Sequence, residues 1–136
     1  MKILKALVVM AGVGMLAGCA SIQTASVSDF NGQKLTIDNK KKDVAHINGS
    51  NWGLYFLKWG LITGSTDTVG DVAFMKDTVR VDKVVNIVTE KSKDMGGKEA
   101  VDMQSGCSSM MIPIPFPFLF YIKEVSVSAN SVKPVK

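Results

Sequence analysis

The sequence predicts an α+β domain in which one amphipathic helix packs on a small, mostly antiparallel sheet. Two observations support this class. Valines recur at helical spacing within residues 78–95, and the segments around this stretch alternate between apolar and other residues, as half-buried strands do. The strands are expected at 43–48, 100–105 and 119–132, which gives a β-α-β-β order past residue 43. A chain of 136 residues favours a single domain, which we place at 32–133.

The chain begins with the composition of a secretory signal peptide. Lys2 and Lys5 give a basic start, residues 6–16 are uncharged and apolar, and the small residues Ala17 and Gly18 follow. This order is typical of a signal that is removed from the mature protein. A membrane-spanning helix needs about 20 apolar residues, and the polar residues after position 20 interrupt this run too soon.

The end of this signal resembles the lipobox of bacterial lipoproteins, with the residues Leu16, Ala17, Gly18 and Cys19. The resemblance implies that residues 1–18 are removed and that the Cys19 thiol is diacylated. It also implies that Ala20, standing where Asp would retain the protein in the inner membrane, directs it to the outer membrane. Each buried methylene contributes ~0.8 kcal/mol, so two or more acyl chains form a lasting anchor. The expected protein is therefore exported and membrane-anchored, on the periplasmic face or the surface.

Removal of the signal leaves 118 residues and lowers the formal net charge from +4 to +2, because Lys2 and Lys5 leave with it. Residues 19–31 are rich in Ser, Thr and Gln and predict a flexible tether between lipid and domain. Lysines occupy 40–42 between two aspartates, a pattern typical of a solvated turn. Nucleic-acid binding would need a basic face with a matching motif, and we expect no nucleic-acid partner.

The first half of the domain contains short strands and one apolar segment. Alternation predicts a short strand at 34–38 and another at 44–47. The segment 51–64 holds both tryptophans, and its glycines argue against a helix, so we expect an irregular or strand-like segment across the core. The alternative is a contact surface for lipid or a partner, since Trp and Tyr suit interfaces. Its candidate residues are Trp52, Tyr55, Phe56 and Trp59.

The helix is the clearest element. Val81, Val84, Val85 and Val88 form one stripe, after an N-cap candidate at Asp77 and Thr78. Glycines at 96 and 97 supply the stop. Valine is a mediocre helix former because its branched side chain is restricted. This helix is therefore expected to depend on its contacts with the sheet.

A loop at 105–109 and an extended apolar segment at 110–122 are expected after the helix and its following strand. Pro113, Pro115 and Pro117 exclude a helix. The prolines share one parity, so all missing N–H donors lie along one edge, as in an edge strand. The segment is interpreted either as a capped edge strand or loop over the core, or as an apolar lip that touches membrane or a partner. The candidate lip residues are Phe116, Phe118 and Phe120.

The last strand presents two parities of apolar residues. Phe120 and Ile122 have one parity, whereas Val125 and Val127 have the other. Either a bulge near 123–124 switches faces, or the two ends are buried on opposite sides. A loose tail is expected from residue 133.

The sequence contains no recognisable catalytic or metal-binding set. His46 is the only histidine, and the carboxylates are scattered among turn and cap positions. With Cys19 acylated, Cys107 has no partner within the chain, so a buried or loop thiol is favoured over an intermolecular disulfide. We expect no enzyme, no metal and no cofactor.

Three functions remain as hypotheses. The leading one is a non-catalytic interaction or structural module of the cell envelope, with a membrane contact through Cys19 and an envelope protein as a candidate partner. The alternatives are a carrier of a hydrophobic ligand or lipid, with segments 52–62 and 110–122 lining its pocket, and a small enzyme. The layout is weakly similar to short bacterial lipoproteins of unassigned function, including the TRL-like group.

Overall fold

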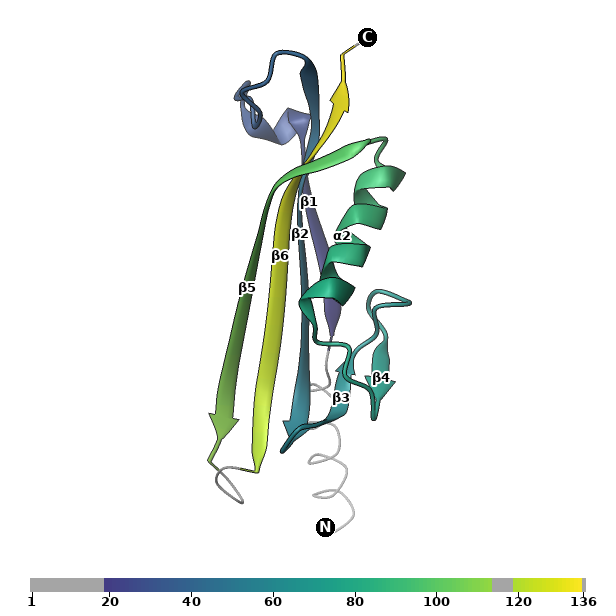
Figure 1. Cartoon of the computed structure of the whole chain (residues 1–136), viewed down its shortest axis with the longest axis vertical. Coiled ribbons are helices and arrows are strands. Elements are labelled where there is room, and N and C mark those ends of the chain that lie inside the picture. Colours follow the sequence, from purple (N-terminus) through teal and green to yellow (C-terminus); the bar gives the residue numbers. More distant parts are fainter. Residues whose placement is uncertain (1–18, 114–118, 136) are drawn as a thin grey trace, which may run out of the picture.

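The computed structural model describes residues 19–113 and 119–135 and confirms a broad α+β class (Figure 1). One helix packs on a mostly antiparallel sheet, but this sheet is larger than predicted and its strand order differs. The described elements are β1 (Ala20–Ser26), the 3-10 helix η1 (Val27–Phe30), β2 (Lys41–Phe56), β3 (Trp59–Gly64), β4 (Val72–Phe74), α2 (Val81–Asp94), β5 (Glu99–Ile112) and β6 (Phe120–Pro134). The sheet order is β4-β3-β2-β6-β5, and β1 also pairs with β2.

The long strand β2 organises the sheet. It pairs with β6 over its whole length along one edge. Along its other edge it pairs first with β1 and then with β3. Side chains alternate between buried and more exposed from Ala45 to Phe56, as expected for a strand with one face on a core. The predicted strand at 43–48 is therefore part of a strand of 16 residues.

The helix α2 covers one face of the sheet. Val84, Ile87 and Val88 are buried against it. The approach is close, because a Cβ placed on Gly49 would lie only 2.7 Å from Cγ2 of Val88. Figure 1 shows α2 beside the upper half of the sheet, while β5 and β6 continue past it. The core that results also includes Ala45, Ile47, Val125, Val127 and Ala129.

The helix is shorter than predicted at its start. The prediction began at residue 78, but the N-cap is Arg80 and the first helical residue is Val81. Thr78 instead uses its hydroxyl to bond the carbonyl of Gly64 at 2.6 Å. Because its hydroxyl is bonded to β3, Thr78 does not cap the helix. The predicted stop is confirmed, since Gly96 has φ of +83°, a conformation that glycine adopts readily.

The predicted tether at 19–31 is wrong. Residues 20–26 form β1, which pairs antiparallel with β2. Ala20 is 1% exposed and belongs to the core, and the hydroxyls of Ser21 and Ser50 lie 2.8 Å apart. Small hydroxyl side chains resemble a linker in composition, but they also suit a strand whose neighbour presents matching groups.

The short strand predicted at 34–38 is also wrong. Ile37 is fully exposed, and the backbone N–H of Leu35 donates to Oδ2 of Asp43 at 2.9 Å. The N–H of Lys40 donates to Oδ1 of Asp38. Side-chain acceptors therefore replace a strand partner in this stretch and hold it as a loop.

The loop predicted at 105–109 lies inside β5. Its Ser, Gly and Cys residues are typical of a loop, yet Ser105, Cys107 and Ser109 pair with Val127, Val125 and Lys123 of β6. Pairing with this strand overrides the weak local preference. A bulge interrupts the pairing between Val101 and Gln104, where Asp102 has φ of +53°.

The two parities of β6 are resolved without the predicted bulge, because its pairing with β2 is regular through Lys123 and Glu124. Val125 and Val127 lie opposite Asn51 and Gly49, on the face under α2. Phe120 and Ile122 lie opposite Phe56 and Leu54, on the other face. The ends of β6 therefore present apolar residues to opposite faces, which was the second alternative. Residues 114–118, with Pro115, Phe116, Pro117 and Phe118, lie outside the described residues.

Candidate functional site

The face of the sheet opposite α2 is here called the bare face, because α2 packs on the other side and leaves it uncovered. Near η1 it is polar, with Ser50, Ser126 and Ser128 among its residues. Glu124, opposite Trp52, stands at the border of this polar region. Beyond that border the bare face becomes apolar, at the end where β2 turns into β3.

The apolar end of the bare face is formed by five strands and is called the apolar patch. Register places its members on the same side of the sheet, because directly paired residues share a face. The members are Trp52, Leu54 and Phe56 of β2, Trp59 and Ile62 of β3, Phe74 of β4, Phe120 and Ile122 of β6, and Met110 and Ile112 of β5. Three of them are well exposed: Trp59 at 55%, Phe74 at 63% and Met110 at 63%.

Aromatic contacts order the centre of the patch. The ring of Phe56 lies 5.1 Å from Phe120 and 6.3 Å from Trp59, measured between centroids. These separations lie in the range of favourable aromatic pairs. Trp52, Phe56, Trp59 and Phe120, proposed from the sequence, therefore share one surface. Phe116 and Phe118 lie outside the described residues.

Tyr55 does not belong to this surface, which corrects its inclusion among the candidate residues. Its side chain is on the face under α2 and is 1% exposed. The ring stacks on Tyr121 with centroids 5.2 Å apart, and the hydroxyl donates to Oδ1 of Asp77 at 2.5 Å. Burial raises the pKa of Tyr55 well above its usual value, and the bond to Asp77 raises it further. Alternation along β2 explains the error, since Tyr55 has the opposite parity to Trp52 and Phe56.

The aliphatic and methionine members of the patch lie within the apolar segments 52–62 and 110–122, but they were not among the candidate contact residues, and Phe74 lies outside both segments. Leu54, Ile122, Met110 and Ile112 carry no chemistry that singles them out. Strand alternation does identify some of them, because Phe120 and Ile122 of β6 point to the opposite face from the core valines of the same strand. Their role in the patch follows only from the pairing of β6 with both β2 and β5.

Cys19 lies beside the apolar patch. Its carbonyl accepts a hydrogen bond of 3.2 Å from the backbone N–H of Trp52. It directly precedes β1, whose Ser21 faces Ser50 on the bare face, so strand alternation places Cys19 on that face as well. A Cβ placed on Gly64 would lie 2.4 Å from the carbonyl carbon of Cys19. Cys19 is therefore fitted where β1 and β3 meet along the edge of β2.

A row of hydrogen bonds crosses the polar part of the sheet. Nδ1 of His46 lies 2.7 Å from Oδ1 of Asn130. Because that oxygen only accepts, the imidazole donates. Nδ2 of Asn130 donates in turn to Oδ2 of Asp102 at 3.2 Å. His46 is thus bonded to an amide and not to a carboxylate, and the row joins β2, β6 and β5.

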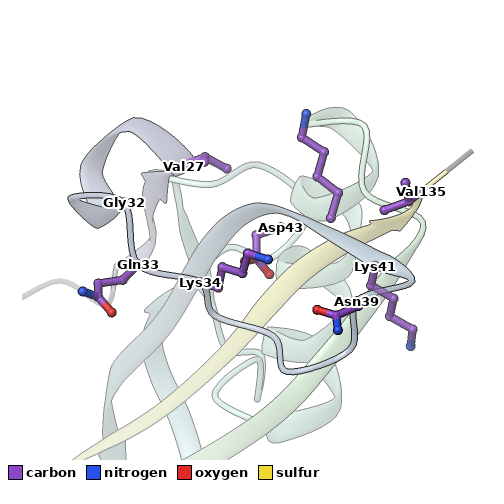
Figure 2. A pocket seen from close by; sticks show the side chains of 9 residues that line it. Val27, Gly32, Gln33, Lys34, Asn39, Lys41, Asp43 and Val135 are labelled. Carbon is purple, nitrogen blue, oxygen red and sulfur yellow. The ribbon is translucent and has the colours of Figure 1, made fainter.

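A pocket lies at the opposite end of the sheet from the apolar patch, with a volume of about 330 Å³. Figure 2 shows Lys34 and Asp43 at its centre, between Val27 and Val135. Oδ1 of Asp43 is buried without a hydrogen-bond partner. Nζ of Lys41 lies 2.6 Å from Oε2 of Glu99, and this hydrogen bond raises the pKa of Lys41. The lining therefore combines charged side chains with the apolar side chains of Val27 and Val135.

Within residues 19–113 and 119–135, no group of His, Cys, Asp or Glu is arranged to hold a metal ion. The same residues include no helix of the length and hydropathy needed to cross a membrane. Comparisons with family models, curated proteins and solved structures found no match to this chain. The similarity to small lipoproteins of the TRL-like group therefore stays a prediction.

Proposed function

We propose that this protein is a lipid-anchored lipoprotein of the cell envelope, exported to the outer membrane, which acts as a non-catalytic interaction or structural module. Acyl chains on Cys19 hold it to the membrane, and the apolar patch rests against the bilayer. The signal and lipobox support the attachment. The observation that carries the proposal is the position of Cys19 beside Trp52, at the margin of the apolar patch.

The proposed acylation site and the apolar patch lie next to each other on the domain. Because β1 begins at Ala20, acyl chains on Cys19 would leave the domain without an intervening linker. The bilayer surface would then lie within reach of Trp52 and Trp59. Exposed apolar patches mark contact sites, and tryptophan suits a membrane boundary because its ring is apolar and its N–H is polar. An acyl anchor together with a second contact holds more firmly than one chain alone.

The carrier alternative has less support. It requires an apolar cavity between helix and sheet, yet the close approach of Val88 to Gly49 leaves α2 directly on β2. The pocket of about 330 Å³ contains Val27 and Val135 beside its lysines, but no described residue of segments 52–62 or 110–122 lines it. An enzyme would need a nucleophile or carboxylate beside His46, whose described side-chain partner is Asn130.

The attachment is tested by the Cys19→Ala variant in a diderm bacterial host. The wild-type protein is expected in the membrane fraction, with a mature N-terminal mass that corresponds to acylated Cys19. Cys19→Ala is expected to remain uncut or to become soluble. Cys107→Ala serves as the matched control and should behave as wild type. Recovery of Cys19→Ala as a mature membrane protein would disprove the anchor.

The orientation is tested with the two native tryptophans, Trp52 and Trp59, which are the only ones in the chain. The purified lipoprotein is placed in phosphatidylcholine vesicles that contain brominated acyl chains, which quench nearby tryptophan fluorescence. We expect strong quenching. A control variant with both tryptophans changed to Phe and Ile37→Trp, at a fully exposed site far from the patch, should show little. Equal quenching in the two proteins would contradict a bilayer contact through the patch.

A further inference from the structure

The outermost strand β5 has one partner in the described part of the chain. It pairs with β6 along one edge, and it ends the order of strands in the sheet. Residues 102–111 are all exposed, so neither face of this stretch is covered either. An edge of this kind presents a row of unpaired backbone N–H and C=O groups, ready to bond another strand.

β5 lacks the usual protections of an edge strand. Natural edges are protected by charges, prolines, bulges or short length. At the other end of the sheet, β4 has only three residues. In β5, residues 104–112 contain no charge and no proline. The bulge before Gln104 and Pro113 after Ile112 limit this segment at its two ends, but they leave its middle open.

We propose that β5 pairs antiparallel with β5 of a second copy of this chain, with the two-fold axis at Cys107, so that two sheets join into one. An antiparallel pair of identical strands satisfies two-fold symmetry with one self-complementary surface. Two neutral strands bring no repulsion together, and the small residues at 105–109 allow close approach. This inference uses the edge geometry and the exposed side chains of β5, and it does not rest on the lipid anchor.

The choice of a second copy and of its register comes from the methionines. Met103 is 40% exposed and Met111 is 50% exposed, on either side of the small central residues. With the axis at Cys107, Met103 of one copy lies next to Met111 of the other, and this happens twice. The pairing therefore covers apolar side chains that the single chain leaves in water. It also places Ser105 opposite Ser109, and Cys107 opposite its own counterpart.

The axis makes position 107 a sensitive site for charge. Directly opposed like charges destabilise a strand pair, whereas opposite charges stabilise it. The full chain is purified in detergent in the Cys19→Ala background and examined by sedimentation. The Cys107→Ser variant should form dimers, and Cys107→Lys and Cys107→Glu should each dimerise about two- to fivefold more weakly. An equimolar mixture of the Lys and Glu variants should recover the dimer.

A crosslinking experiment locates the axis. In the same background, the oxidant diamide takes up two electrons and two protons as two Cys107 thiols form one disulfide. Single cysteines at 105 or 109, in chains with Cys107→Ser, should not link to themselves. A mixture of Ser105→Cys and Ser109→Cys chains should link across the dimer. A purely monomeric Cys107→Ser protein, charge variants that dimerise equally well, or crosslinks independent of position would each overturn the proposal, as would an unrelated protein found paired with β5.

Discussion

Apolar side chains lie on both faces of the sheet, but at different positions along the strands. Within the described residues, α2 covers only one of these faces. Under α2, Ile47, Val125 and Val127 are fully buried. On the bare face, Trp52 and Phe120 come from the same two strands, β2 and β6, and remain half-buried. The covered face accounts for the stability of the fold, and the bare face retains apolar area that a membrane contact can use. Alternate residues of the same strands therefore differ in role: one set packs in the core, and the other set forms the exposed apolar surface.

The largest expected effect compares equivalent truncations on the two faces. Ile47→Ala, on the covered face, should lower the free energy of unfolding by about 2–5 kcal/mol, because it leaves a cavity in a packed core. Ile122→Ala, on the bare face, should cost about 1 kcal/mol or less, since its surroundings are partly solvated. Urea unfolding followed by circular dichroism measures both. Equal losses would show that the bare face is packed as tightly as the core.

A buried polar residue offers the next test. Asn51 is fully buried, and its amide donates to the carbonyls of Gly64 and Thr78 at 3.1 and 2.9 Å. Asn51→Ala should destabilise the protein by about 1–3 kcal/mol, because it removes two buried hydrogen bonds. The two carbonyls keep their other donors, the Thr78 hydroxyl for Gly64 and the Arg80 N–H for Thr78. Asn48→Ala, at an exposed site on the bare face, is the matched control and should change little. A harmless Asn51→Ala variant would mean that water replaces the amide.

The pH dependence of stability probes Tyr55 on the covered face. Its pKa is raised in the folded protein, first by burial and then by Asp77. Below about pH 10 the phenol keeps its proton in both states. Above that pH the unfolded chain loses the proton first, so stability falls as pH rises towards the folded pKa. Tyr55→Phe should flatten this fall between pH 9 and 11.5 in thermal unfolding. An identical slope in both proteins would show that Tyr55 is not the group responsible.

The smallest effect on stability is expected from the exposed part of the apolar patch. Trp59→Ser combined with Phe74→Ser should change the free energy of unfolding by about 1 kcal/mol or less. The same variant should bind less of a dye that fluoresces on exposed apolar surfaces, because this area is already in water. A loss of several kcal/mol would place these side chains in the folding core and remove the distinction between the two faces.

Local periodicity was sufficient to predict the helix and the α+β class. The valine stripe identified α2, and Gly96 ended it. The alternation of apolar residues in β6 also indicated that the sheet has apolar residues on both faces. The choice between a bulge and burial on opposite faces needed the register of β6 with β2. Strand β1 and the second half of β5 were missed for a common reason, whereas the strand predicted at 100–105 lies within β5. Their small and polar residues are typical of loops and linkers. Their conformation is instead decided by pairing with β2 and β6, which are distant in sequence.

The candidate site was predictable only in part. Trp52, Phe56, Trp59 and Phe120 were identified because aromatic residues are conspicuous in apolar segments. Tyr55 was included wrongly, since its side depends on where β2 begins its alternation. The aliphatic members of the apolar patch, such as Leu54 and Ile122, required the cross-strand pairing. The closeness of Cys19 to Trp52 was not predicted, because a flexible tether at 19–31 would give Cys19 no fixed position on the domain.

The strand β1 gives the junction at Cys19 a mechanical property. A force applied at Cys19 along the axis of β1 loads its seven register pairs with β2 side by side, in shear, so they must fail together. A force applied across the sheet would instead open the pairs one after another from Ala20. A protein held at Cys19 would therefore resist tension along the strand better than peeling, and its strength would depend on the direction of the pull.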